Sequence, residues 1–310
     1  MRADPDVPVV GVVVVNWNDA AATIACLDSL AATCGVACRA YVVDNASADG
    51  SAARIAAAHP AAVVVRSPVN LGFAGGCNLG VRRALADGVG WVWLLNNDAT
   101  VEPDTAAALL AHARSAGPAI LSPKIVYADR PGVLWSAGGY FDRALKSHHV
   151  GRDEPDRAQY DAPRTVDWAS GCSLFFPAEV WRQVGPLDER YFLYLEDVDW
   201  CLRARRAGVP VRYVPAARVR HAVSRSVSRL GPARLWYYSW RNYYLLATRR
   251  GRWWQRLRAW ADLASRFAKI AVRSAVDPAC RHDPVYQART RGLLDFVRGR
   301  FGAWQSGEVA

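Results

Sequence analysis

Runs of apolar residues, bounded by polar or turn-forming residues, alternate with helical patterns over the first third of the chain. The runs at 9–15, 41–43, 63–65 and 91–95 are rich in β-branched and aromatic residues, which is typical of buried parallel strands. Segments with apolar residues at helical spacing separate them. This alternation predicts an α/β fold with a doubly wound, mostly parallel sheet and right-handed crossovers.

The alternation becomes less regular after about residue 120. Strands are still expected at 120–121, 125–127 and 211–214, and a helix at about 197–207. The stretch 130–165 is rich in Gly, Pro and charge, so it predicts a loop or a hairpin.

Polar clusters follow three of the predicted strands. In an open parallel sheet the carboxyl ends of the strands form the ligand crevice. Each cluster alone is also explained by turn formation and helix capping. Three clusters in register favour a ligand site, and they are Asn16-Trp17-Asn18, Asp44-Asn45 and Asn96-Asn97-Asp98.

Asp98 carries the most specific chemistry of these residues. It follows the apolar run 91–95, where a buried carboxylate must be compensated. A divalent cation that bridges Asp98 to diphosphate oxygens would compensate it, because Mg²⁺ is commonly held by one or two carboxylates and phosphates. The alternative is an N-cap for the helix that begins near Pro103, for which Asp104 is better placed.

A glycine-rich segment at 70–78 lies before the helix that ends near Leu85. It lacks the G-x-G-x-x-G spacing of dinucleotide-binding loops, and it follows the third predicted strand and not the first. Glycines before a helix allow the backbone to approach a ligand, and a helix N-terminus favours anions. A tight left-handed turn explains the same glycines, so both interpretations stay open.

Charge is distributed unevenly along the 310 residues, whose formal net charge is +11. Residues 1–200 carry 16 Lys and Arg against 23 Asp and Glu, whereas residues 201–310 carry 23 against 5. We therefore predict an acidic globular domain at 1–230 and a basic, aromatic helical region at 231–310 with an anionic partner.

The location of the chain is predicted from its cysteines and its apolar runs. The seven cysteines are odd in number and form no C-x-x-C pair, which indicates a reducing compartment. The N-terminal octapeptide is polar, unlike a signal peptide, and no apolar run reaches the length of about 18 residues of a spanning helix. We expect a cytoplasmic protein, at most bound to the inner face of the membrane.

Five motifs occur in order along the chain: VVNWN at 14–18, VVDNAS at 42–47, NLGFAGGCN at 70–78, LLNND at 94–98 and FLYLEDVDWCLR at 192–203. With these motifs, roughly residues 7–225 resemble the family 2 glycosyltransferases of the GT-A fold. The resemblance is to the branch that includes bacterial rhamnosyltransferases.

The resemblance implies a nucleotide-sugar site at the strand ends. Asp44 would contact the pyrimidine base, since a carboxylate can accept from its N3–H group. The family's Asp-x-Asp metal motif has Asn96 at its first position here, which leaves Asp98 to hold Mg²⁺ or Mn²⁺ together with His221. The residues expected to bind the nucleotide sugar are Asn16, Asn18, Asp44, Asn45, Asn70, Gly72, Gly75, Asn78, Asn96 and Asn97.

The resemblance also implies the catalytic pair Glu196 and Asp197, with Asp197 as the general base. Displacement at the anomeric carbon requires removal of the proton of the acceptor hydroxyl, and a single displacement inverts the configuration. An acidic first helical turn that complements the helix dipole is the alternative. This alternative explains Asp199, which can form an ion pair with Arg203, four residues further along the helix. His148 and His149 are expected in an exposed loop.

The implied activity is transfer from a dTDP- or UDP-sugar, dTDP-rhamnose among them, to a hydroxyl of a lipid-linked or cell-surface glycan. The alternative is a catalytically silent scaffold that binds nucleotide sugars in a polysaccharide assembly complex. Both Asp98 and Asp197 are present, and a scaffold needs neither.

The region from 232 to 275 combines five tryptophans with ten Lys and Arg. Trp at a membrane interface and Arg near anionic lipid explain this composition, and so do helices packed on the catalytic domain. The two explanations are compatible. Nucleic-acid binding ranks third, and no nucleic-acid-binding motif occurs.

Overall fold

The computed structural model describes residues 9–304, apart from the side chains of residues 116 and 224–230. The polar N-terminal octapeptide, on which the prediction about a signal peptide rests, lies outside the described residues. Residues 305–310 of the predicted helical region lie outside them as well.

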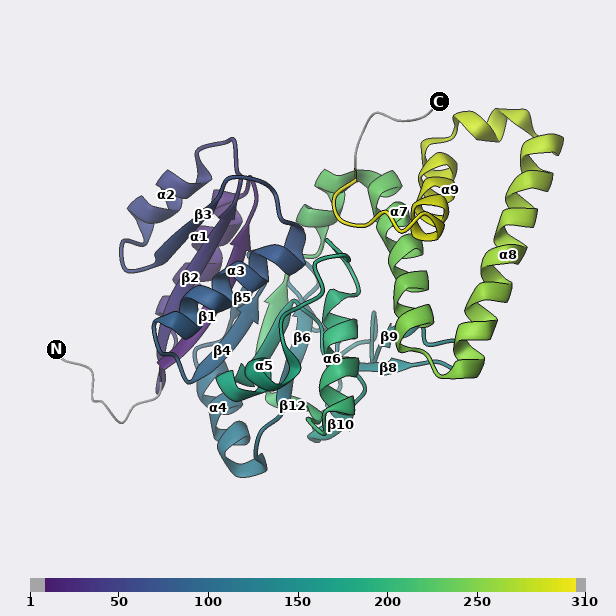
Figure 1. The fold of residues 1–310 in the computed structure, drawn as a ribbon. Coiled ribbons are helices and arrows are strands. Elements are labelled where there is room, and N and C mark those ends of the chain that lie inside the picture. Colours follow the sequence, from purple (N-terminus) through teal and green to yellow (C-terminus); the bar gives the residue numbers. More distant parts are fainter. Residues whose placement is uncertain (1–8, 305–310) are drawn as a thin grey trace.

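A single large sheet forms the centre of the molecule (Figure 1). Strands β3, β2, β1 and β4 are parallel neighbours, β11 runs antiparallel between β4 and β6, and β12 lies parallel to β6. The predicted mostly parallel α/β fold is therefore confirmed. The strands are β1 (Val9–Asn16), β2 (Ala37–Asn45), β3 (Val63–Ser67), β4 (Trp91–Leu95), β5 (Ala99–Val101), β6 (Ile120–Tyr127), β7 (Leu134–Ser136), β8 (Gly139–Phe141), β9 (Ser147–His149), β10 (Arg164–Val166), β11 (Ser173–Pro177) and β12 (Val211–His221).

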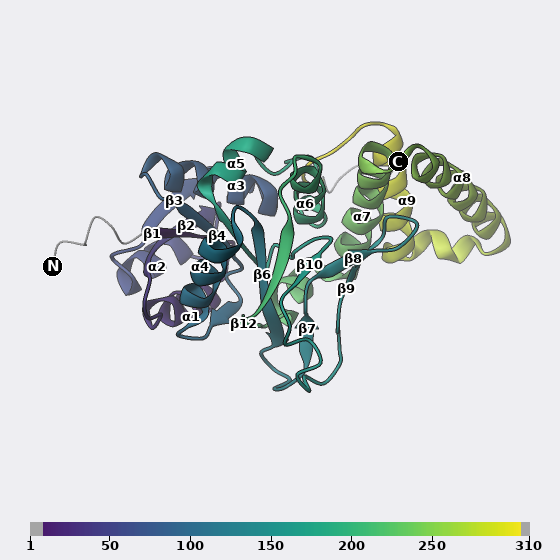
Figure 2. The ribbon, with the colours of Figure 1, turned by 90° about the horizontal axis from the view of Figure 1, so that it is seen from below.

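Helices cover both faces of this sheet, as Figure 2 shows. Alternate residues of β1 divide between the layers, since Val13 packs with α3 while Val12 and Val14 pack with α1 and α4. The helices of these layers are α1 (Ala20–Ala31), α2 (Ser51–Ala58), α3 (Gly72–Ala86), α4 (Thr105–Ala116), α5 (Ala178–Val184) and α6 (Glu196–Arg206).

Strand β12 is longer than the sequence predicted. We expected it to end at Val214, but it continues to His221. The register against β6 shifts between Val214 and Arg218, and pairing then resumes on β6 and on β5. This irregularity surrounds Pro215, which has no N–H to donate. The proline interrupts the strand pattern in the sequence, so the predicted strand was too short.

The basic C-terminal region is a group of helices beside the sheet, at the right of Figure 1. It comprises α7 (Ser224–Arg250), α8 (Trp253–Val276), the 3₁₀ helix η1 (Pro278–His282) and α9 (Pro284–Val297). Helix α7 is kinked at Gly231, whose φ of 73° is left-handed, just before Pro232. The domain boundary that we predict, between 230 and 231, falls at this kink.

Helix α7 turns most of its aromatic side chains inward. Tyr237, Tyr238 and Tyr244 are buried, and Trp240 packs against the core on the sheet, whereas Trp236 is 37% exposed. Packing therefore accounts for most of the aromatic residues of this helix. Within residues 9–304, no helix combines the length and the apolar composition needed to cross a bilayer.

Candidate active site

A cavity of about 1110 Å³ opens at the carboxyl ends of the parallel strands. The side chains and backbone that line it come from the ends of β1, β2 and β4, the starts of α3 and α6, the end of β12 and the segment 127–172. The loop at 192–195, helix α7 and residues 303–304 line it as well. Nine of the residues predicted for the site lie on its wall: Asn45, Asn70, Gly72, Asn96, Asn97, Asp98, Glu196, Asp197 and His221.

Asparagine side chains fix the loops at the strand ends. Asn45 accepts from the Leu71 N–H and donates to the Asn70 side chain and the Gly72 carbonyl. Asn70 in turn accepts from the Gly72 N–H at 2.8 Å. Asn97 donates to the Thr23 hydroxyl. These bonds hold the start of α3 against the end of β2, so the rim of the cavity is preformed.

Asn16 and Asn18 lie behind this rim. Asn16 donates to the Asp44 carboxylate and to the Ser47 hydroxyl, both at 3.1 Å. Asn18 accepts from the Ala48 N–H. In the described structure Asn16, Asn18 and Asp44 support the loop after β2 and do not line the cavity. A contact of Asp44 with a base therefore remains a prediction.

Gly75 and Asn78 of α3 face the protein interior and likewise do not line the described cavity. Asn78 accepts from the Leu187 N–H and donates to the Leu187 carbonyl and the Glu189 carboxylate. A Cβ added to Gly75 would lie 2.7 Å from Leu71. At Gly72, whose φ is +70°, an added Cβ would lie 2.3 Å from the Phe192 carbonyl oxygen. Glycine at 72 and 75 thus allows close packing of α3.

Asp98 and His221 are brought together by strand pairing. Ala99 of β5 stands opposite His221 of β12, and the Ala222 N–H donates to the Asp98 carbonyl. The His221 Nε2 atom lies 3.2 Å from the Asp98 Oδ1 atom, and both side chains are buried. The Asn96 amide is 3.4 Å from the same ring nitrogen. Asp104 occupies the N-cap of α4, but its side chain makes no capping bond there.

This pair fits a metal ion shared with a ligand. Two neighbouring ligands of an octahedral ion with bonds of about 2.1 Å are about 3 Å apart, close to the separation of the two atoms. In the described part of the chain, no group of three or more His, Cys, Asp or Glu side chains could hold an ion by itself. Further ligands would have to come from a bound diphosphate or from water.

Glu196 and Asp197 form the first turn of α6, and both line the cavity. Asp197 accepts from the Gly171 N–H at 2.6 Å and from the Val198 N–H at 2.7 Å. The Glu196 Oε2 atom is buried and has no hydrogen-bond partner among the described residues. Burial, together with the charge of Asp197, raises the pKa of Glu196 well above its usual range.

Burial also raises the pKa of Asp197, although its backbone hydrogen bonds oppose the increase. Because these bonds stabilise the ionised form, Asp197 is the member of the pair that ionises first. Two residues on, Asp199 pairs with Arg203 at 2.9 Å and with Arg250 at 2.6 Å. The pairing of Asp199 with Arg203, expected from the sequence, is therefore present.

The loop before α6 is strained and is held by α7. Phe192, Tyr194 and Leu195 all have left-handed backbone, with φ of 63°, 70° and 72°. Asn242 donates to the carbonyls of residues 191, 193 and 194, and Arg241 donates to those of residues 190 and 191. The basic region thus helps to position Glu196 and Asp197.

An aromatic row forms another wall of the cavity. Trp168 meets His149 at 4.7 Å between ring centroids, His149 meets Trp135 at 4.3 Å, and Trp135 meets His221 at 4.7 Å. The expectation that His149 is exposed in a loop was wrong, because it ends β9 between two tryptophans. Burial lowers the pKa of His149 to about 3, so its ring is neutral at physiological pH.

The sequence analysis missed this wall, although it carried a signal. Trp135 and Trp168 are large aromatic residues in a stretch otherwise rich in Gly and charge. The buried Trp135 Nε1 donor has no partner among the described residues. Aromatic rings with polar edges suit the faces and hydroxyls of a sugar.

Comparisons with known proteins agree with this geometry. A family model described as "Glycosyltransferase like family 2" matches residues 5–241. An N-acetylglucosaminyl-diphospho-decaprenol L-rhamnosyltransferase of Mycobacterium tuberculosis is 30% identical over 263 residues, which cover 76% of this chain and 83% of the relative. The hexosyltransferase Agl10 of low-salt glycan biosynthesis in Haloferax volcanii is 28% identical, covering 55% of this chain and 54% of that protein.

A solved structure shows the same fold. The mannosyltransferase PcManGT from Pyrobaculum calidifontis, in complex with GDP-Man and Mn²⁺, superposes with a TM-score of 0.57 at 18% identity. The match covers 95% of this chain and 87% of that one. The extent of the family match and the identity to the mycobacterial relative show that this chain belongs to glycosyltransferase family 2.

Proposed function

We propose that the protein transfers a sugar, with inversion, from a nucleoside diphosphate to a hydroxyl of a lipid-linked or cell-surface glycan. The single observation that carries this proposal is the buried pair Glu196 and Asp197 on the wall of the cavity, with one carboxyl oxygen that has no partner among the described residues. A buried carboxyl without a partner costs stability, so its presence beside a cavity points to a ligand.

Asp197 acts as the general base. Its two backbone bonds fix the carboxylate while each oxygen keeps a lone pair for the acceptor. The acceptor oxygen attacks the anomeric carbon and gives its proton to Asp197. The bond between that carbon and the diphosphate oxygen breaks in the same step, and the nucleoside diphosphate leaves with the electron pair. Glu196, protonated beside ionised Asp197, donates a hydrogen bond to the bound sugar.

Asp98 and His221 would hold a divalent cation, Mg²⁺ or Mn²⁺, at the diphosphate. Bound there, the ion supplies positive charge that stabilises the leaving group. The solved mannosyltransferase contains Mn²⁺ and a nucleotide sugar, which supports this part of the proposal. Asn45, Asn70 and Gly72 would contact the donor from the opposite rim.

We propose a dTDP- or UDP-sugar as the donor, with dTDP-rhamnose as the first candidate, because the mycobacterial relative is a rhamnosyltransferase. Its name also contains a diphospho-decaprenol acceptor, which supports a lipid-linked acceptor here. The row of Trp135, His149 and Trp168 offers aromatic faces on which an acceptor sugar can stack.

A ligand screen followed by a turnover assay tests the proposal. Nucleotide sugars are first screened by thermal unfolding with and without Mn²⁺, because a ligand that binds only the folded state raises the melting temperature. The best donor is then incubated with a polyprenyl-diphosphate-linked acceptor, and NMR gives the anomeric configuration of the product. We expect inversion. Retention, or stabilisation by no nucleotide sugar, would contradict the proposal.

A further inference from the structure

Helix α8 exposes large apolar side chains along one side. Of nine large apolar side chains exposed in the described structure, five belong to this helix. Such a concentration is typical of an interaction surface. Together with two exposed alanines they succeed one another at spacings of three or four residues, the spacing of one helix face. We name these residues the α8 stripe: Trp253, Leu257, Trp260, Ala264, Ala268, Val272 and Val276.

Most of the stripe lies away from the side by which α8 packs on the protein, although the Trp260 ring also meets the Phe296 ring at 5.6 Å. Ala259 and Leu263 are buried, and Phe267 and Ile270 are partly buried against the core. By contrast, Trp253 is 73% exposed and Val276 is 80% exposed. Figure 1 shows α8 at the outer edge of the molecule, with α7 between it and the sheet. The α8 stripe therefore faces outward after the helix has made its core contacts.

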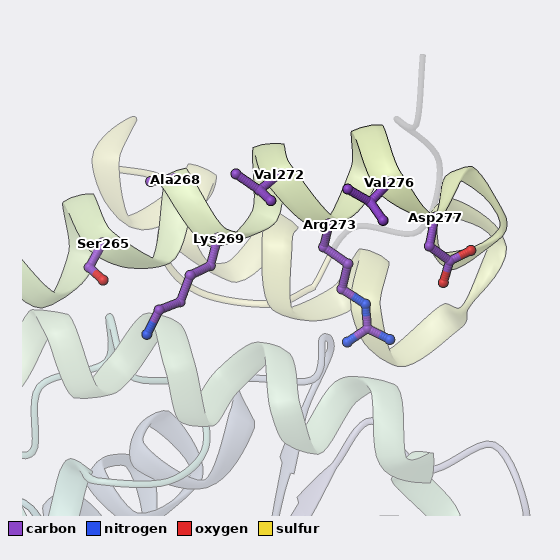
Figure 3. Close-up of a pocket in the computed structure, with 7 residues that line it drawn as sticks. All are labelled: Ser265, Ala268, Lys269, Val272, Arg273, Val276 and Asp277. Atoms are coloured by element: carbon purple, nitrogen blue, oxygen red, sulfur yellow. The ribbon is translucent and has the colours of Figure 1, made fainter.

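Positive charge borders the stripe. Arg252, Arg256, Arg258 and Lys269 are all exposed on or beside the helix. Figure 3 shows Lys269 and Arg273 along one side of the helix, and Val272 and Val276 on another. The one acidic residue within α8, Asp262, bonds to Tyr244 and Arg266 and so is neutralised. Asp277, directly after the helix, is exposed beside Val276 (Figure 3). A cationic, amphipathic face whose cations outnumber its acids is typical of helices that lie on anionic lipid.

We propose that the α8 stripe docks on the surface of an anionic lipid bilayer, with α8 parallel to the membrane plane. Trp253 and Trp260 would occupy the interfacial layer, where tryptophan is preferred, and the bordering cations would contact lipid phosphates. A second copy of the chain is a poorer occupant, because pairing two such faces brings like charges together. This inference is independent of the sugar that the enzyme transfers.

Sedimentation with vesicles tests the docking, with the full chain and no nucleotide present. We expect binding to vesicles of equal parts phosphatidylcholine and phosphatidylglycerol that weakens with rising salt, because screening shortens the range of the attraction. Binding to phosphatidylcholine alone should be at least about tenfold weaker. Equal binding to both vesicle types, or none to either at low salt, would overturn the proposal.

Paired variants localise the contact. Leu257→Ser with Trp260→Ser, and Trp253→Ser alone, should each weaken binding to the mixed vesicles. The control Val69→Ser with Val297→Ser also removes two exposed apolar side chains and should bind like wild type. Arg258→Ser with Lys269→Ser should weaken binding and flatten its salt dependence. Its control, Arg54→Ser with Arg82→Ser, removes the same charge elsewhere and should not.

Two further measurements complete the test. Thermal unfolding should be close to that of wild type for every variant except Leu257→Ser with Trp260→Ser, which loses the contact of Trp260 with Phe296. Trp253→Ser, at a residue that is 73% exposed, tests the stripe without that loss. Stripe variants that bind vesicles as wild type does would overturn the proposal. So would a dimer in sedimentation velocity that Leu257→Ser with Trp260→Ser abolishes, because the stripe would then contact a second copy.

Discussion

Arg241 of α7 and Glu196 of α6 are both buried ionisable residues beside the loop at 190–195, yet they differ in partners. Arg241 makes five hydrogen bonds: to Asn242, to the Tyr237 hydroxyl and to the carbonyls of residues 190, 191 and 302. The Glu196 Oε2 atom has none among the described residues.

This difference distinguishes a buried ionisable group that stabilises the fold from one that is available to a ligand. A buried cation whose donors are all used fixes the elements around it, and its removal leaves carbonyls without partners. A buried carboxyl without partners costs folding free energy and is available to a ligand. Asp199, on the same turn as Glu196 but paired with two arginines, belongs to the structural class.

The largest expected effect is on turnover in Asp197→Asn. Removal of the general base should lower kcat by about 10²–10⁴-fold, while donor affinity changes little because the base acts on the acceptor. Steady-state kinetics and donor titration measure the two quantities. Glu179→Gln, an exposed carboxyl on α5, is the control. A kcat within a few fold of wild type would remove Asp197 from the mechanism.

Arg241→Ala should lower the free energy of unfolding by about 3 kcal/mol, because several buried carbonyls lose their donor. Denaturant unfolding measures this loss. Arg249→Ala, an exposed arginine of the same helix, should change stability little. The strained loop before α6 should also loosen, so kcat of the folded variant should fall. A fully stable Arg241→Ala protein would mean that this arginine is not structural.

The third prediction concerns Asp98, a buried carboxylate that contacts the His221 ring. The change is Asp98→Asn. We expect the metal concentration needed for donor binding to rise by about tenfold or more, because the amide is a weaker ligand. Isothermal titration of the donor across a Mn²⁺ series measures this shift. Identical titrations for both proteins, or donor binding by wild type that ignores EDTA, would contradict the metal assignment.

Glu196→Gln should show the smallest effect, a gain in stability of about 1 kcal/mol at neutral pH. Since burial raises the pKa of Glu196, its contribution is favourable below the usual glutamate pKa and is lost as pH rises through the folded-state value. The variant should therefore match wild type at low pH and exceed it at neutral pH. Thermal unfolding at several pH values checks this, and a destabilised variant would place Glu196 in the structural class.

Much of the fold followed from local pattern. The β-branched runs gave the four parallel strands, since a strand buried on both faces is continuously apolar. The sequence did not predict β12 beyond Val214, because its continuation to His221 depends on tertiary pairing with β5 and β6 around Pro215. The kink at Gly231 coincides with the predicted boundary. The sequence did not predict the hydrogen bonds from Asn242 to the loop at 191–194, which join the two predicted domains.

The site was predictable where its residues end strands or begin a helix. Asp98 and His221 are 123 positions apart in sequence, and the family resemblance, not the pattern, joined them. His149 was misplaced because its burial comes from Trp135 and Trp168 on other segments. Composition alone could not separate α7 from α8 either. Both are rich in Trp and Arg, but α7 buries most of its aromatic residues, with Trp236 37% exposed, while α8 exposes Trp253 and Trp260 more fully.

The dependence of kcat/KM on pH tests most directly the claim that Asp197 is the base. The raised pKa of Asp197 means that kcat/KM should decrease, as pH falls, through a midpoint above the usual aspartate value of about 4. Protonation of Asp197 removes the lone pair that accepts the proton of the acceptor. The residual activity of Asp197→Asn should lack this decrease. A kcat/KM of wild type that stays constant down to about pH 4 would contradict the account.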